Sequence, residues 1–354
     1  MPADGHTAPP ARDWRTRVVR AWNTRGPLAV ALLPLSWIFG GLAGLRRALW
    51  RAGVFKPQRL PCPVVVVGNR IAGGAGKTPT TIAVVSHLQR RGWQVGVVSR
   101  GHGRDGSAPV CIDARTPAAV AGDEPLLIAR RCGVPVAVGR DRSAAGRLLL
   151  SRHPQVDLIV ADDGLQHLAL ARDVEIVVFD ERGAGNGWLL PAGPLREAID
   201  APSMARSQLV LYNAGSPSTT LPGWLGTRRP GGFVLLQDWW EGRPSAPRPA
   251  ALFDGRGVLA AAGIAVPGRF FDALRAAGLR VEELALPDHH DFATLPWPAD
   301  TPRVVLTEKD AVKLAPDRAG LAAMEIWVAQ LDFELEAGFL AALDAGLPRP
   351  PSPN

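Results

Sequence analysis

Cysteine and lysine are both scarce in this chain of 354 residues. The three cysteines, Cys62, Cys111 and Cys132, lack the C-x-x-C spacing of a metal or redox site. Their small, odd number excludes a disulfide framework and a cysteine zinc site, and it favours a reducing compartment. Arginine supplies nearly all of the forty basic residues, so a lysine within a phosphate-binding pattern is less easily explained by chance.

The positive charge is concentrated at the N-terminus. The net charge is +7, and hydrophobic content of 47% excludes global disorder. Residues 1–56 contain nine Lys or Arg against two Asp, a surplus of +7 that equals the net charge of the whole chain. The remainder is close to neutral, which argues against a nucleic-acid groove. We therefore expect no nucleic-acid partner, and nothing in the sequence indicates an obligate protein partner.

An uncharged run from residue 26 to residue 45 lies between Arg25 and Arg46. About 20 helical residues match a hydrocarbon core of about 30 Å, but Pro34 and three glycines weaken a membrane span. Basic residues at both ends give no orientation, and no signal-peptide cleavage site is evident. We predict a monotopic helix that lies in or dips into the cytoplasmic leaflet, with arginines against anionic headgroups. The alternative is a buried core helix.

Strands and helices alternate after this segment. The first expected strands are residues 64–67, 95–98, 134–138, 158–161 and 176–179. Their alternation with helices predicts a doubly wound, largely parallel α/β domain, a P-loop NTPase-like fold, with a second, smaller α/β domain further along. The expected division is a basic segment with a membrane-associated helix at 1–56, a first α/β domain at 57–205, a linker with short strands at 206–250, a second α/β domain at 251–346 and a tail at 347–354.

A glycine-rich loop follows the first strand and opens a helix expected at residues 79–90. The loop residues are Gly73, Gly74, Ala75, Gly76, Lys77 and Thr78. Strand, glycine loop and helix in this order form a phosphate-binding loop, in which backbone N–H groups and the helix N-terminus surround phosphate oxygens. Lys77 would reach the β- and γ-phosphates, and the Thr78 hydroxyl would ligate Mg²⁺. Ile71 stands where the standard pattern has a glycine; the alternative is a chance glycine turn.

Acidic and histidine motifs follow several strands. Asp162 and Asp163 end an apolar strand, the Walker B arrangement that holds Mg²⁺, although Asp-Asp-Gly could be a simple turn. Asp123 could be a base toward a substrate hydroxyl or merely the N-cap of a helix. Residues 288–291, Asp-His-His-Asp, could supply an acid/base histidine or form a polar loop. In parallel sheets the carboxyl ends of the strands share one crevice, so the charged or glycine-rich residues that end four expected strands, 99–101, 139–142, 162–164 and 180–183, should converge on the phosphate loop.

Two further segments carry weaker signals. Residues 307–310, Thr-Glu-Lys-Asp, close another strand, and they also fit a capping box that opens a helix at 310–314. Residues 189–197 form a long loop that could present Arg196 to a phosphate. Neither segment identifies a function alone.

In combination, these motifs resemble those of the tetraacyldisaccharide 4'-kinase family of the lipid A pathway. The resemblance covers roughly residues 28–328 and rests on motifs that run in family order: 67–69 with 73–79, 99–104, 122–125, 139–142, 162–167, 190–197, 288–290 and 307–313. His102 stands where the family often has a tyrosine, and the Ile71 departure is similar to the family's own pattern.

The resemblance implies ATP- and Mg²⁺-dependent phosphorylation of the 4'-hydroxyl of a tetraacyldisaccharide 1-phosphate, which gives lipid IVA. It implies a peripheral or monotopic enzyme at the cytoplasmic face of the inner membrane. It implies Asp123 as base, with His289 as its partner and His290 as the alternative. It further implies Asp162, Asp163 and Thr78 around the metal, and Gln166, His167 and Arg196 near nucleotide or substrate phosphates.

Two rival functions are open at this point. One is a P-loop GTPase or ATPase that acts as a switch or delivers a metal at the membrane; such proteins often carry a lysine before the double glycine, where this chain has Ala72. The other is a non-catalytic nucleotide sensor. The complete set of Lys77, Thr78, Asp162 and Asp163 argues against the sensor.

Overall fold

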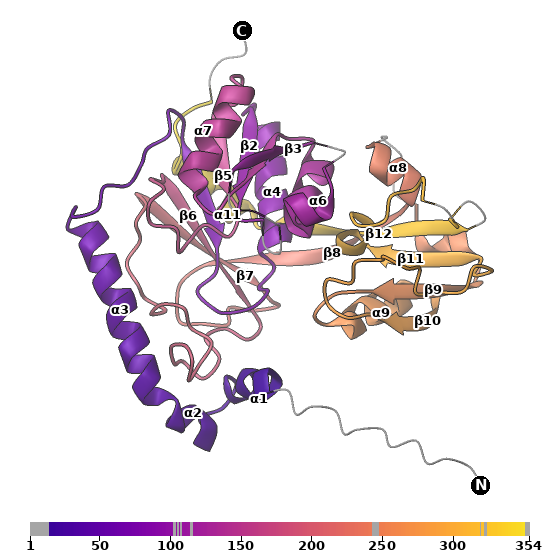
Figure 1. The fold of residues 1–354 in the computed structure, drawn as a ribbon, viewed down its shortest axis with the longest axis horizontal. Helices are drawn as coiled ribbons and strands as arrows, with labels where there is room; N and C mark the ends of the chain where they lie inside the picture. Colours follow the sequence, from indigo (N-terminus) through magenta and orange to yellow (C-terminus); the bar gives the residue numbers. More distant parts are fainter. Residues whose placement is uncertain are drawn as a thin grey trace.

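The structure is a computed structural model, drawn as a ribbon in Figure 1. It describes residues 14–350 except 102, 103, 105, 107, 114, 115, 243–247, 319, 322 and 323. His102, the expected departure from the family motif, lies outside the described residues. In the described part, twelve strands form one continuous sheet that runs through two lobes.

The first lobe contains the phosphate loop and a largely parallel stretch of the sheet. In spatial order its strands are β7 (Ser207–Asn213), β6 (Val174–Asp180), β1 (Val64–Gly68), β5 (Leu158–Ala161), β2 (Val95–Ser99), β4 (Val136–Val138) and β3 (Val110–Ile112). Only the edge pair β3 and β4 is antiparallel within this stretch. The predicted α/β fold with a parallel sheet is therefore confirmed.

Helices cover both faces of the first lobe. They are α4 (Lys77–Arg90), α5 (Ala118–Ala121), α6 (Asp123–Cys132) and α7 (Arg142–Arg152). Successive β1 residues point to opposite faces. Val65 and Val67 join a core with the α4 residue Val84, whereas Val64 and Val66 join a second core with residues of α7. Because both faces of the sheet are buried, β1 is apolar throughout rather than alternating.

The second lobe is smaller and uses the other end of the sheet. Its strands are β9 (Gly257–Ala262), β10 (Arg280–Ala285), β11 (Arg303–Thr307) and β12 (Glu325–Leu335). Its helices are α8 (Leu236–Glu241), the short 3₁₀ helix η1 (Ala250–Phe253), α9 (Pro267–Ala276) and α10 (Glu308–Ala311). Parallel pairing joins β10, β9, β11 and β12 in that order. The predicted second α/β unit is thus present as a second sheet region.

A long antiparallel pair joins the two lobes. It consists of β8 (Trp224–Leu235) and β12, which pair from Trp327 to Leu335, with a shift in register after Gln330. Figure 1 shows this pair running between the lobes. The expected linker at 206–250 therefore differs from the structure in one respect. Its first strand, β7, pairs with β6 along its whole length, because its buried apolar residues complete the first lobe's sheet.

The last helix, α11 (Ala337–Ala345), also departs from the expected division. It packs on β7 in the first lobe rather than on the second lobe. Asp344 accepts a hydrogen bond from His87 Nε2 at 2.9 Å and pairs with Arg91 at 3.1 Å, both at the end of α4. The chain thus returns to the first lobe after completing the second.

The N-terminal segment forms helices α1 (Trp14–Ala21), α2 (Pro27–Ala31) and α3 (Leu33–Arg51). Figure 1 shows α3 lying along the outside of the first lobe. Trp37 is 71% exposed and Leu42 64%, so the alternative of a buried core helix is wrong. In the described part of the chain, no helix combines the length and apolar character needed to cross a membrane.

Candidate active site

The phosphate loop is shaped by glycines that adopt left-handed backbone conformations. Gly73 has φ of 91°, and Gly76, with φ of 80°, is the N-cap of α4. Because Gly76 supplies the cap, the helix begins at Lys77, two residues before the expected start. Asn69 Nδ2 donates to the Gly73 carbonyl at 3.0 Å and closes the loop. A Cβ at Gly76 would lie 1.9 Å from Asn213 Nδ2, so only glycine fits there.

Arg182 supports the loop from the end of β6. Its guanidinium donates to the Gly74 carbonyl at 2.8 Å, and its Nε donates to Asp180 Oδ2 at 2.9 Å. The carboxylate fixes the arginine, and the arginine in turn holds a carbonyl of the loop. Arg182 belongs to a strand end that was expected to converge on the loop, whereas Asn213 was not identified from the sequence, since its contact joins segments far apart in the chain.

The two acidic residues after β5 lie beside the loop, where the sequence placed them. Asp163, with φ of 46°, places Oδ1 at 3.7 Å from Lys77 Nζ and 3.7 Å from Arg196. Asp162 is buried and accepts hydrogen bonds from Thr81 Oγ1 at 2.9 Å and Ser99 Oγ at 3.3 Å.

The charge balance around these carboxylates favours a cation. Burial, followed by the negative charges of Glu124 and Asp163, raises the pKa of Asp162 to about 7. Asp163 Oδ1 is buried and receives no hydrogen bond from any residue that the structure describes. Neighbouring carboxylates, one of them with an unsatisfied oxygen, next to a phosphate loop suit Mg²⁺, which uses one or two carboxylates together with substrate phosphates.

A metal site made entirely of protein side chains is a different matter. Among the described residues, no three His, Cys, Asp or Glu side chains are grouped as metal ligands. The donor set is therefore that of a nucleotide-dependent Mg²⁺ site, in which phosphate oxygens and water complete the shell.

A cavity of about 260 Å³ opens next to these carboxylates. It is lined by Ser99, Arg100, Glu124, Arg142, Asp163, Gln166, His167 and Arg196. Three arginines in one small cavity are typical of an anion site. Arg142, from one of the strand ends expected to converge here, is itself buried and donates to the Asp163 carbonyl at 2.9 Å.

Gln166, His167 and Arg196 lie together at this cavity, as predicted for residues near phosphates. Gln166 Nε2 donates to the Asn69 carbonyl at 3.0 Å, and Arg196 donates to Gln166 Oε1 at 3.3 Å. Burial, reinforced by the charge of Arg142, lowers the pKa of His167 to about 4. His167 is therefore neutral at pH 7, and its 3.6 Å approach to Asp141 is not an ion pair at that pH.

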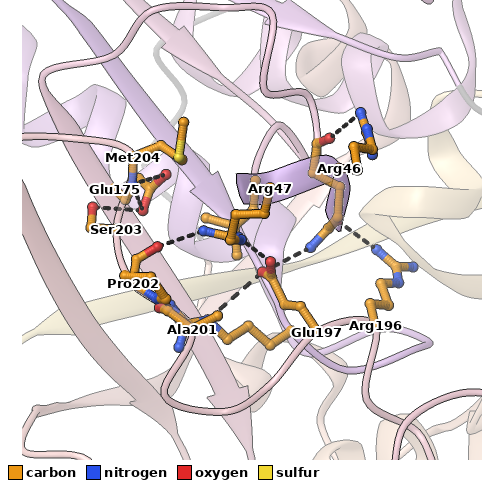
Figure 2. A network of polar contacts seen from close by, with 12 residues as sticks. Arg46, Arg47, Glu175, Arg196, Glu197, Ala201, Pro202, Ser203 and Met204 are labelled. Atoms are coloured by element: carbon orange, nitrogen blue, oxygen red, sulfur yellow. Dashed lines mark hydrogen bonds and ion pairs between the residues drawn. The ribbon is translucent and has the colours of Figure 1, made fainter. Parts of the chain in front are cut away.

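The loop that carries Arg196 is attached to α3. Figure 2 shows Glu197 meeting the guanidinium of Arg47, which also donates to the Pro202 carbonyl. Glu197 lies 3.7 Å from Arg70 Nε, beside the phosphate loop. The N-terminal helix is thus joined through one carboxylate to the segment that presents Arg196.

Asp123 and His289 come together from different lobes. Asp123 is the first residue of α6, and its Oδ2 lies 2.9 Å from His289 Nδ1. The N-cap of α6 is Gly122, and no side chain caps the helix, so the capping alternative for Asp123 is wrong. His290 has a different place: its Nδ1 accepts a hydrogen bond from the Phe292 backbone N–H at 3.1 Å. Geometry therefore favours His289 over His290 as the partner of Asp123.

Two lysines of the second lobe lie beside this contact. Lys313 Nζ is 3.7 Å from Asp123 Oδ2, and Lys309 Nζ is 3.4 Å from His289 Nε2. Thr307 is the N-cap of α10, as the capping-box interpretation predicted, although the helix runs from Glu308 to Ala311 rather than from 310 to 314. Sequence analysis did not assign Lys313 to the site, because only the fold brings it to Asp123.

Comparisons with known proteins agree with this geometry. A profile of the family described as tetraacyldisaccharide-1-P 4'-kinase matches residues 28–348. The tetraacyldisaccharide 4'-kinase of Methylibium petroleiphilum is 57% identical over 98% of this chain and 98% of its own length. That of Leptothrix cholodnii is 57% identical over 94% of this chain and 96% of its own length.

A solved structure gives the same result. LpxK from Aquifex aeolicus, determined in complex with ATP, superposes with a TM-score of 0.76 at 25% identity, covering 90% of this chain and 99% of its own. The profile spans nearly the whole chain, and the relatives align over almost their full lengths. The chain therefore belongs to the tetraacyldisaccharide-1-P 4'-kinase family.

Proposed function

We propose that this protein transfers the γ-phosphate of ATP to the 4'-hydroxyl of a tetraacyldisaccharide 1-phosphate and so forms lipid IVA, with the Asp123–His289 pair activating the hydroxyl. The kinase activity follows from the family and from its ATP-bound relative. The observation that carries the residue assignment is the 2.9 Å contact between Asp123 and His289, next to Glu124, which lines the cavity.

The phosphate loop binds the nucleotide in this proposal. Backbone N–H groups of residues 73–78 and the N-terminus of α4 surround the phosphates, and Lys77 neutralises charge on the transferred group. Thr78, Asp162 and Asp163 would hold Mg²⁺, which would neutralise negative charge on the transferred phosphate. Arg142 and Arg196 line the cavity and would supply further positive charge for phosphate oxygens.

Hydroxyl activation falls to Asp123. The carboxylate accepts the proton of the 4'-hydroxyl while the sugar oxygen bonds to the γ-phosphorus and the bond to ADP breaks. His289 holds the carboxylate from the second lobe. Because Asp123 begins a helix, the positive end of the helix dipole also faces its charge.

The N-terminal helix suits a substrate that stays in a bilayer. On α3, Leu35, Trp37, Ile38, Leu42 and Leu45 are exposed. Arg46 and Arg47 follow them and contact the loops next to the cavity. We include in the proposal that this helix lies on the cytoplasmic surface of the inner membrane, with arginines toward anionic headgroups. The cavity would then face the lipid headgroup.

A product assay tests the proposal. The full chain in detergent, with Mg²⁺ and ATP, should add one phosphate to the tetraacyldisaccharide 1-phosphate, and the product should be identified by its mass. Asp123→Ala should lower kcat by about 100-fold or more while leaving the affinity for a non-hydrolysable ATP analogue nearly unchanged.

Two results would contradict it. Hydrolysis of GTP without a phosphorylated lipid would favour the switch or metal-delivery alternative. Wild-type turnover by Asp123→Ala would leave the kinase activity standing but remove Asp123 from its role.

A further inference from the structure

Residues 307–313 begin at the last residue of β11 and have no role in the function proposed above. This segment carries several charged side chains, although much of it is buried. It contains two of the chain's few lysines, Lys309 and Lys313, together with Glu308 and Asp310. Glu308 and Asp310 are buried, and the Lys313 side chain is only 5% exposed. Buried charges are costly unless each is paired, so the arrangement of these groups is specific.

Asp310 organises the second lobe beside the site. Its Oδ2 accepts hydrogen bonds from the Gly263 backbone N–H at 3.0 Å and from Thr307 Oγ1 at 2.7 Å. Its Oδ1 accepts a hydrogen bond from Lys313 Nζ at 3.2 Å. The Gly263 carbonyl in turn accepts the backbone N–H of His289 at 3.2 Å. One fully buried carboxylate therefore fixes both the His289 loop and the Lys313 ammonium.

Lys313 reaches across to the first lobe. Its Nζ lies 3.7 Å from Asp123 Oδ2, the same oxygen that contacts His289 Nδ1. The ammonium also lies 5.5 Å from the centre of the Phe292 ring, so an aromatic face covers it on another side. The lysine is thus a fixed positive charge between the carboxylates of Asp310 and Asp123. A compact ammonium fits such a place better than the planar guanidinium that this chain uses almost everywhere else.

The other end of helix α6 is attached to the same segment. Arg131, near its C-terminus, lies 3.4 Å from the buried Glu308 carboxylate. Arg131 also contacts Asp332 of β12 at 2.6 Å. Helix α6 therefore meets the second lobe at both ends, through Asp123 and through Arg131. This attachment limits movement of the helix, so that the Lys313 contact acts on a carboxylate whose backbone is already placed.

We propose that Lys313, held by Asp310, is a positioning residue that keeps the Asp123 carboxylate directed at His289. Without the ammonium, Asp123 Oδ2 loses its contact with Lys313, and the carboxylate can rotate away from His289. The inference rests on the proposed role of Asp123 in hydroxyl activation. It predicts an effect on turnover and not on nucleotide binding, because the contacts of Lys313 are with Asp123, Asp310 and Phe292 rather than with the phosphate loop.

A double-mutant cycle tests this coupling. In the full chain with detergent, Lys313→Met should lower kcat by roughly 10- to 100-fold, the size expected for a misplaced reacting group, with KM for ATP unchanged within about twofold. In the Asp123→Ala background the same Lys313→Met change should alter kcat by less than about threefold, since its target is gone. An equal loss in both backgrounds, or no loss in the wild-type background, would overturn the proposal.

A second variant guards against a folding defect. Lys313→Met leaves Asp310 as a buried charge without its lysine, whereas Asp310→Asn combined with Lys313→Met removes both charges and should fold more readily. This double variant should bind an ATP analogue normally and still turn over slowly; wild-type kcat would refute the inference. Arg275→Met is the matched control, because Arg275 pairs with Asp272 and Glu283 on the surface of the same lobe and should leave kcat unchanged.

The same experiments separate this inference from the proposed function. If Asp123→Ala has a low kcat and Lys313→Met has a normal kcat, only the positioning role of Lys313 is refuted. Normal turnover by Asp123→Ala would refute the role of Asp123, and the positioning role of Lys313 with it.

Discussion

The two walls of the site are built in different ways. The phosphate wall comes from one continuous stretch, β1, the glycine loop and α4, joined to the adjacent parallel strand that ends in Asp162 and Asp163. The opposite wall depends on single side chains from two lobes: Asp123 and His289 are 166 positions apart in the sequence. Local backbone geometry fixes the first wall, whereas the placement of the two lobes fixes the second. We therefore propose that binding of nucleotide and activation of the acceptor hydroxyl are separable in this protein.

The largest expected effect comes from the phosphate wall. Lys77→Ala removes the ammonium that faces Asp163 and the phosphates, so both charge neutralisation and nucleotide affinity are lost. We expect kcat/KM for ATP to fall by about 1,000-fold or more, measured by product formation and by titration with an ATP analogue. If Lys77→Ala instead kept its affinity for the ATP analogue and lost only kcat, the two walls would be less separate than the structure indicates.

A smaller effect, confined to turnover, should come from the other wall. His289→Ala removes the partner of Asp123 without touching the loop, so kcat should fall by about 100-fold while KM for ATP stays within about twofold. His290→Ala is the matched control, because the ring of His290 accepts a local backbone hydrogen bond from Phe292 and packs on the Phe292 ring. A larger loss of kcat for His290→Ala than for His289→Ala would reverse the assignment.

The same contrast explains what the sequence could predict. Two motifs follow strands at recognisable spacing, one with Lys77 and Thr78 and the other with Asp162 and Asp163. Because parallel strands end at a common edge, the sequence pattern alone predicts that these residues meet. The pairing of Asp123 with His289 came from the family resemblance, since from residues alone Asp123 could equally have been a helix cap.

Other contacts had little or no signal in the chain. The position of Arg182 at a strand end predicted that it lies near the loop, but not which carbonyl it contacts. Asn213 supports the loop only because β7 pairs with β6, which in turn pairs with β1. The membership of β7 in the first lobe was missed for the same reason, because a short apolar strand does not indicate which neighbour it pairs with. Lys313 reaches Asp123 only because α10 packs against α6. Long-range pairing of this kind is decided by packing, which single-sequence patterns do not contain.

The smallest expected effect is on the free energy of unfolding. It follows from His167, which lines the cavity next to the phosphate wall. Its pKa is lowered to about 4 in the folded state by burial and by Arg142, against a reference value of 6.5. Between these values the unfolded chain binds a proton at this site and the folded chain does not, so the free energy of unfolding must fall as the pH drops. From pH 7 to pH 5 this site alone should cost about 2 kcal/mol.

Urea denaturation at the two pH values measures that cost. His167→Gln removes the titrating group, so its free energy of unfolding should fall less than that of the wild type over the same interval. The buried surroundings at this position come from one lobe, as Arg142 and Asp141 both lie at the start of α7. The difference in pH dependence between the wild type and His167→Gln should therefore persist when Lys313→Met is added, although this change weakens the contact between the lobes. If the pH dependence of His167 instead vanished in Lys313→Met, the phosphate wall would depend on the second lobe, and the two walls would not be independent.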